Sequence, residues 1–93
     1  MTMTPTIGRI VQYTLSELDA TKITQARTED LDTSGNAVRA GDIFPMLITR
    51  VWGSTPESAV NGQVFLDGND SLWVTSASVG EGPGHFAWPV REA

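Results

Sequence analysis

Hydrophobic and polar residues alternate over several short stretches of the chain, which is the pattern of β-strands with one buried face. The first stretch covers residues 6–15, where Ile7, Val11 and Tyr13 share one side with Arg9. The stretch is also rich in β-branched and aromatic side chains, which favour extended backbone. It is therefore predicted to be a strand whose mainly apolar side faces the core.

A helix is predicted directly after this strand. Ser16 is a typical N-cap residue, and the acidic Glu17 and Asp19 follow it in the first turn. Leu15, just before the cap, is placed to pack back against the helix. The pattern predicts a helix over residues 17–27.

The middle of the chain combines a polar loop with a long apolar strand. Residues 28–41 are polar and rich in turn-forming side chains, so they are predicted to form an exposed loop. Residues 43–52 are apolar at most positions, which predicts a long strand that is apolar on both faces. Pro45 lacks a backbone N–H, so it is expected at the start of that strand, at a bulge or on an edge.

The second half of the chain contains the clearest hairpin. Residues 60–66 and 71–77 read as two strands, and residues 67–70 supply the Asp, Gly and Asn that tight turns need. A last strand is predicted over residues 85–90, after the glycine-rich loop at residues 80–84.

Together these elements predict a single domain over residues 1–93, with a flexible tail at residues 1–5 and an exposed loop at residues 28–41. The fold class is mainly β (α+β): five short strands with one helix near the N-terminus. Such a set favours a small, strongly bent sheet or a partly open barrel of SH3-like or OB-like type.

Composition narrows the partners. Eleven acidic against six basic residues give a net charge of −5, which disfavours binding to duplex nucleic acid or to an anionic membrane. No cysteine is present, and we expect neither a leader sequence nor a membrane span, so a cytosolic protein is predicted. With only 93 residues to build a core, its stability is expected to gain from self-association into a homo-oligomer.

No set of residues resembles a catalytic or metal centre. There is one histidine, no cysteine and no nucleophile motif, so we expect a binding protein that is not an enzyme and needs no cofactor. The acidic turn at residues 67–70 is far shorter than a calcium loop with flanking helices, and a plain turn is the better interpretation.

Aromatic residues, arginines and the histidine are instead the candidate binding residues. Aromatic rings can stack on a planar ligand, and strand arginines can neutralise phosphates. The alternative for each is structural: core packing for the aromatic rings, and a solvated face or an ion pair with Asp42, Asp67 or Asp70 for the arginines. The predicted ligand-binding residues are Arg9, Tyr13, Arg50, Trp52, His85, Phe86 and Trp88.

Four segments carry a resemblance to a known group of proteins: residues 6–13 (TIGRIVQY), residues 40–46 (AGDIFPM), residues 60–70 (VNGQVFLDGND) and the Trp88-Pro89 end. Over nearly its whole length the chain resembles a family of small, mostly uncharacterised proteins of tailed bacteriophages, especially those that infect actinobacteria. Family members often have His where this chain has Gln12, and Trp where it has Phe86. The resemblance implies a phage context in the cytoplasm of an infected bacterium, but no activity.

The leading hypothesis from the sequence is a phage-encoded, non-enzymatic protein that sequesters a small nucleotide-like immune signal as a homo-oligomer. The glycine-rich loop at residues 80–84 is expected to close over that ligand. The alternative is an interaction protein without a small-molecule ligand, either a virion accessory or an inhibitor of a host protein. Binding of single-stranded nucleic acid is disfavoured by the net charge, and an enzyme is the weakest hypothesis.

Overall fold

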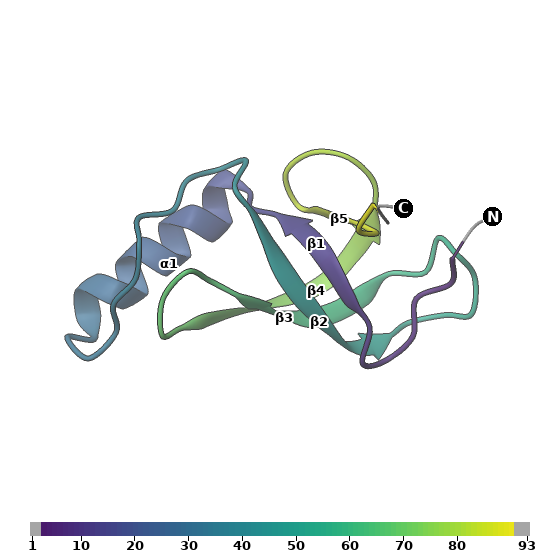
Figure 1. The fold of residues 1–93 in the computed structure, drawn as a ribbon, viewed down its shortest axis with the longest axis horizontal. Helices are drawn as coiled ribbons and strands as arrows, with labels where there is room; N and C mark the ends of the chain where they lie inside the picture. Colours follow the sequence, from purple (N-terminus) through teal and green to yellow (C-terminus); the bar gives the residue numbers. More distant parts are fainter. Residues whose placement is uncertain (1–2, 91–93) are drawn as a thin grey trace.

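The computed structural model describes residues 3–90, and within that range it forms a closed five-stranded β-barrel with one α-helix (Figure 1). The elements are β1 (Ile10–Thr14), α1 (Glu17–Glu29), β2 (Ile43–Val51), β3 (Val60–Phe65), β4 (Ser71–Val79) and β5 (His85–Ala87). The prediction of a small, mainly β barrel with one helix near the N-terminus is confirmed.

The strands neighbour one another in chain order. β1 is antiparallel to both β2 and β5, and only the last pairing, between β4 and β5, is parallel. This order differs from the Greek-key order of an OB-fold. Pro45 lies in the part of β2 that pairs with β1 but not with β3, because the pairing of β2 with β3 begins at Met46. The missing N–H of Pro45 therefore interrupts no ladder.

The core consists of the inward-facing residues of the strands together with two residues from the helical region. Val11 and Tyr13 point inward from β1, as the sequence pattern predicts, and Leu15 is fully buried after the strand. The other buried apolar residues are Ile23, Met46, Ile48, Val60, Val64, Leu66, Val74, Ala77 and Phe86. Ile7 is exposed instead, because it precedes β1 in a turn.

The start of α1 is fixed by a capping box. The Asp19 N–H donates to Ser16 Oγ (3.1 Å), and the Ser16 N–H donates to Asp19 Oδ2 (2.9 Å). Tyr13 adds a third bond, because its hydroxyl donates to the same Asp19 oxygen at 2.6 Å. Burial and this hydrogen bond raise the pKa of the Tyr13 hydroxyl above its usual range. The bond ties the core of the barrel to the helix.

Most of α1 is exposed, and Figure 1 shows it at one end of the molecule, beside the β3–β4 hairpin. Ile23 is its only buried residue, so packing alone holds the helix weakly. Arg27 makes up for this with a two-pronged ion pair, from Nε to Asp70 Oδ2 (2.8 Å) and from Nη2 to Asp70 Oδ1 (3.0 Å). Within residues 3–90, no helix is long and apolar enough to cross a membrane.

The polar segment after the helix is docked onto the hairpin turn. The Ser34 N–H donates to Asn69 Oδ1 (2.9 Å), and Asn36 Nδ2 donates to Asp67 Oδ2 (2.6 Å). Gly35 forms an isolated bridge with the turn at a backbone separation too small for a side chain, because a Cβ on Gly35 would lie 2.7 Å from the Asp67 carbonyl oxygen. The predicted exposed loop is thus held by many hydrogen bonds.

Several predicted boundaries differ from the structure. The first strand begins only at Ile10, and the last strand already ends at Ala87, so both are shorter than predicted. The helix runs two residues longer than predicted, to Glu29. Residues 1–2 of the predicted flexible tail lie outside the described residues, while Pro5 is buried.

Replacing Asp70 with Asn is expected to lower the free energy of unfolding by about 1–3 kcal/mol at pH 7, because a charged hydrogen-bond partner of Arg27 is lost. The Arg27 and Asp70 side chains are only 13% and 16% exposed, so water screens the pair weakly. Urea unfolding of the variant and the wild type measures the difference. Asp32→Asn is the control, since it removes an exposed carboxylate from the neighbouring loop.

The same pair predicts a pH dependence. The hydrogen bond from Arg27 lowers the pKa of the Asp70 carboxyl group. A carboxyl group with a lowered pKa stabilises the folded state above its unfolded pKa of about 3.9, and this stabilisation is lost as the pH falls through the lower folded value. The difference between wild type and Asp70→Asn should therefore shrink in acid. A difference that does not change with pH, or an equal loss in Asp32→Asn, would contradict this role.

Candidate functional site

The most prominent surface of the barrel is the outer side of β1 to β4. Ile10 pairs with Leu47, Leu47 with Gln63, and Gln63 with Trp73, so these four side chains form a row across four strands. The residues between them in each strand point into the core, so the row points outward. Trp73 is 62% exposed and Ile10 is 58% exposed, which makes this an apolar surface open to solvent.

Two neighbouring positions extend this row. Phe65, two residues after Gln63 on β3, is 48% exposed, and Trp52, which follows β2, is 55% exposed. Arg50, on β2, provides the positive charge of this surface. We call the group the outer aromatic face; its members are Ile10, Leu47, Arg50, Trp52, Phe65 and Trp73.

A buried amide positions Trp52. Asn61 is 7% exposed, and its Oδ1 accepts hydrogen bonds from the Trp52 indole Nε1 (3.0 Å) and from the Ser76 backbone N–H (2.8 Å). Asn61 and Gln63 are two residues apart on β3 and so point to the same side of the sheet. Trp52 is therefore anchored on the same outer side as Trp73.

Two irregularities in the sheet meet at Asn61. The β2–β3 register shifts between Ile48 and Arg50, and the β3–β4 register shifts between Val60 and Gly62. At the second shift, Ser76 has a φ of 54°, which is the only positive φ of a non-glycine residue within residues 3–90. Such bulges bend strands and redirect side chains, and strained backbone of this kind often lies at functional sites.

Arg50 stacks on Trp52. The carbon at the centre of its guanidinium group lies 4.3 Å from the centroid of the indole ring, which is within cation–π range. The prediction that these two residues act together is consistent with this contact. Asp70, named above as one possible partner of a strand arginine, is paired with Arg27 instead.

A second arginine–tryptophan pair lies between the chain segment before β1 and the segment after β5. The guanidinium carbon of Arg9 lies 5.0 Å from the centroid of the Trp88 ring. Trp88 is half-buried and meets Phe86 edge to face, with centroids 6.3 Å apart and ring planes at 82°. Trp88 thus covers one side of the core, and Arg9 lies over it.

Tyr13 and Phe86 are corrected by the structure. They are 3% and 0% exposed, because both point inward from strands that close the barrel. Neither ring offers a face to a ligand, so the structure does not support the predicted ligand contact of either residue. Tyr13 instead supports the helix cap through Asp19.

His85 stands apart from the arginine–tryptophan pairs. Its Nδ1 lies 3.2 Å from Ser78 Oγ and 3.2 Å from the Ser78 carbonyl oxygen, and its ring packs against Gly80. The glycine-rich loop at residues 80–84 is bonded at both ends, since the Gly80 N–H donates to Phe86 and the Gly84 N–H donates to Thr14. The loop thus connects β4 to β5, and main-chain hydrogen bonds hold both of its ends.

The structure places the seven predicted residues in three kinds of surroundings. Two belong to the core, four form two separate arginine–tryptophan pairs, and His85 contacts β4. The sequence prediction does not include Phe65, Asn61, Ile10 or Trp73. The alternation of the hairpin residues contains the signal for Trp73 and Phe65. It places their side chains on the side of the sheet that faces away from the buried Val64 and Val74.

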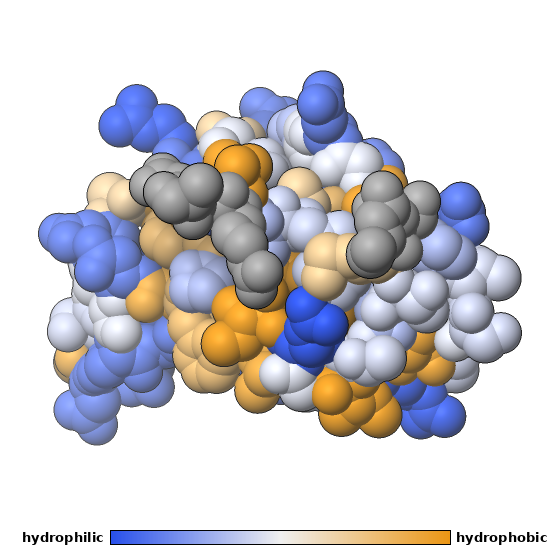
Figure 2. Space-filling model, turned by 45° about the vertical axis from the view of Figure 1, so that its right-hand side comes forward, coloured by the Kyte–Doolittle hydropathy of each residue, from blue (hydrophilic) through white to orange (hydrophobic). Residues whose placement is uncertain are grey.

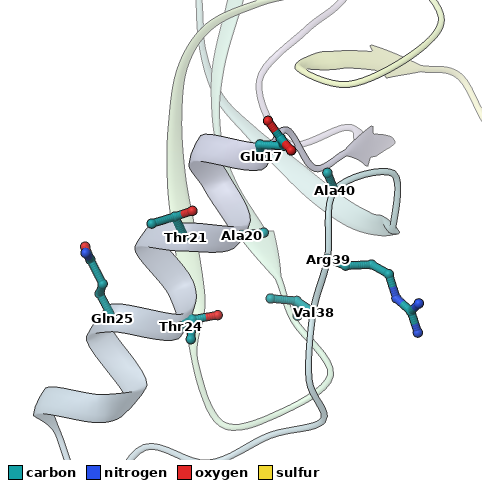
Figure 3. A pocket seen from close by; sticks show the side chains of 8 residues that line it. All are labelled: Glu17, Ala20, Thr21, Thr24, Gln25, Val38, Arg39 and Ala40. Atoms are coloured by element: carbon teal, nitrogen blue, oxygen red, sulfur yellow. The ribbon is translucent and has the colours of Figure 1, made fainter.

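A shallow groove of about 710 Å³ runs between α1 and the segment before β2. Figure 3 shows Val38 pointing toward the helix and Arg39 pointing away from it. The lining residues are Glu17, Ala20, Thr21, Thr24, Gln25, Val38, Arg39 and Ala40, and none is a predicted site residue. Among residues 3–90, no group of three or more His, Asp or Glu side chains is placed to hold a metal ion.

Charge is distributed very unevenly over the molecule. None of the residues in the five strands is Asp or Glu, and Arg50 is the only Lys or Arg among them. The acidic residues within residues 3–90 all lie in α1, the turns and the loops. Figure 2 shows one side of the molecule on which apolar residues gather in the middle and lower part, while strongly hydrophilic ones lie mainly at the margin.

Comparison with known proteins gives no match: no family model fits the chain, and no curated protein or solved structure is similar to it.

Replacing Asn61 with Leu is expected to lower the free energy of unfolding by about 1–3 kcal/mol, because the Trp52 indole and the Ser76 N–H lose their shared acceptor. Gln63→Leu is the matched control, because it also replaces an amide side chain with leucine, two residues away on the same strand. Its amide oxygen accepts only one hydrogen bond, at 3.3 Å from Ser71. Chemical denaturation of both variants should separate them, and equal losses would contradict the role of Asn61.

Proposed function

We propose that this chain is a non-enzymatic binding protein that docks a protein partner through the outer aromatic face. The observation that carries the proposal is that Trp52 and Trp73, both more than half exposed, lie on one side of a sheet whose strands contain no carboxylate. An interaction protein is expected to show exposed tryptophans without an enclosed polar pocket, and the geometry of this face agrees with that expectation.

The chemistry of the face is suited to a protein interface. Tryptophan and arginine are the residues that most often dominate binding energy, and they do so from the centre of a patch surrounded by polar residues. A surface without carboxylates can be covered by an apolar partner without the desolvation of buried negative charges. Arg50 adds a cation that an acidic group of the partner can meet.

The resemblance to small phage proteins suggests where such a partner would be found. In that context the chain acts in the cytoplasm of an infected bacterium, as an inhibitor of a host protein or as an accessory of the virion. Its net charge of −5 supports a protein partner over duplex nucleic acid.

A second function, sequestration of a nucleotide-like signal by a homo-oligomer, is favoured by one observation. Arg50 lies over the exposed ring of Trp52, which places a cation beside a flat surface that can stack on a base. Arg9 and Trp88 form a similar pair. In this version Tyr13 and Phe86 support the site from the core.

Phe65→Lys is expected to abolish capture of the protein partner, since it places a charge on the apolar face. Leu31→Lys is the control, because Leu31 is 94% exposed in the loop after α1 and is not one of the residues of the face. Tagged wild type and both variants are used to isolate bound protein from host lysate, and bound proteins are quantified by mass spectrometry. Equal capture by all three would contradict docking through this face.

Native mass spectrometry with a panel of cyclic oligonucleotides and NAD-derived nucleotides tests the second function. If the chain sequesters such a ligand, the wild type should bind it in fixed stoichiometry and Arg50→Ala should lose it. Binding that is unaffected by Arg50→Ala removes the Arg50–Trp52 pair from the site. Absence of any bound nucleotide leaves protein docking as the function.

A further inference from the structure

One edge of β4 has no strand beside it over most of its length. β4 pairs with β3 along residues 71–77, but with β5 only at Ser78 and Val79, which pair with His85 and Phe86. Within residues 3–90, no strand adjoins the other side of residues 71–77. Only these two residue pairs connect β4 to β5, and residues 71–77 keep a free edge on that side of β4.

The main-chain groups that point to this edge follow from the ladder. The Leu66 N–H donates to the Asp70 carbonyl oxygen (3.4 Å), and in an antiparallel ladder bonded pairs alternate with non-bonded pairs. Leu72 and Val74 therefore bond to β3, whereas Ser71, Trp73 and Thr75 direct their N–H and C=O groups to the free edge. The side chains of these last three residues are exposed.

This edge lacks the features that keep strand edges from pairing with other chains. Natural edges are protected by charged side chains, prolines or short length. β4 is nine residues long and contains neither a charged residue nor a proline. Its regular course is broken only at Ser76, where φ is 54°. Residues 71–75 are thus ready to accept another strand.

We infer that the edge of β4 pairs with the same edge of a second copy of this chain, in an antiparallel, two-fold symmetric arrangement. Main-chain groups are self-complementary in such a pair, so no matching side chains are needed. Each copy carries a net charge of −5, which opposes contact through the acidic loops and helix. β4 is an uncharged strand, so two copies can meet there without placing like charges together.

Only one register bonds all three of these edge residues in both copies. Because Trp73 is the middle of the three residues that point to the edge, it lies opposite Trp73 of the second copy, and Ser71 lies opposite Thr75. Directly opposed residues point to the same side of a sheet, so the two tryptophans stack against each other on the outer side. The dimer joins two barrels into one continuous sheet and places two outer aromatic faces side by side.

A charge exchange at the centre of the pair tests this dimer. Trp73→Lys and Trp73→Glu each place like charges opposite one another and are expected to weaken self-association by at least about tenfold, while a mixture of the two restores it. Trp73 is 62% exposed, so neither variant disturbs the core. Sedimentation velocity over a range of concentrations measures the wild type, each variant and the mixture.

Two controls separate this proposal from docking through the outer aromatic face. Phe65→Lys changes that face on the neighbouring strand and should leave the dimer intact. Thr75→Pro removes an edge N–H without a bond to β3, so it should abolish the dimer while the face stays unchanged. A Phe65→Lys variant that still captures the partner contradicts docking through the face, whereas a Thr75→Pro variant that still dimerises contradicts pairing through the edge.

A cross-link gives a second readout on the same geometry. The chain has no cysteine, and opposed residues of a bonded antiparallel pair have Cα atoms about 5.5 Å apart, within the range of a disulfide. Trp73→Cys should form a disulfide-linked dimer on mild oxidation, and Phe65→Cys should not. A wild type that stays monomeric up to about 1 mM, or equal cross-linking at both positions, overturns the proposal.

Discussion

The bend of the sheet at Asn61 is the feature on which the rest of the structure depends. Five short strands close into a barrel only if some of them bend sharply, and both register shifts of the sheet occur beside this residue. Each shift leaves main-chain groups out of the regular ladder, and the buried Asn61 amide satisfies one of them, the N–H of Ser76. The same amide holds the Trp52 indole, so the closure of the barrel and the placement of an exposed tryptophan depend on one side chain.

The separation of charge explains how one small chain can be acidic overall and yet present an apolar surface. The carboxylates of residues 3–90 lie in the helix, the turns and the loops, where they cap α1 and bind Arg27. The strands are left without acidic side chains, so the outer aromatic face and the edge of β4 are the parts of the molecule that another protein can cover at the lowest desolvation cost. Acidic charge and exposed apolar surface are thus carried by different elements of the fold.

Local signals predicted the elements well, and the sites only partly. The cap at Ser16 and the hairpin turn at residues 67–70 depend on neighbouring residues, so the sequence shows them directly. Alternation also shows which residues of one strand share a side, but it does not say which side is closed off by distant strands. The sequence therefore predicts ligand contacts at Tyr13 and Phe86 although the barrel encloses them, and it predicts no role for Trp73 although this side chain lies outside.

The most direct test is hydrogen exchange of the individual β4 amides, measured by NMR at increasing protein concentration. It shows whether the edge of β4 is free within one molecule and becomes covered when two molecules meet. At low concentration the amides of Leu72 and Val74, bonded to β3, should exchange slowly, while those of Trp73 and Thr75 should exchange fast. At high concentration the amides of Trp73 and Thr75 should become protected as the edge is covered. Slow exchange of all four amides at every concentration would show that the edge is already covered within one molecule, and would contradict the account.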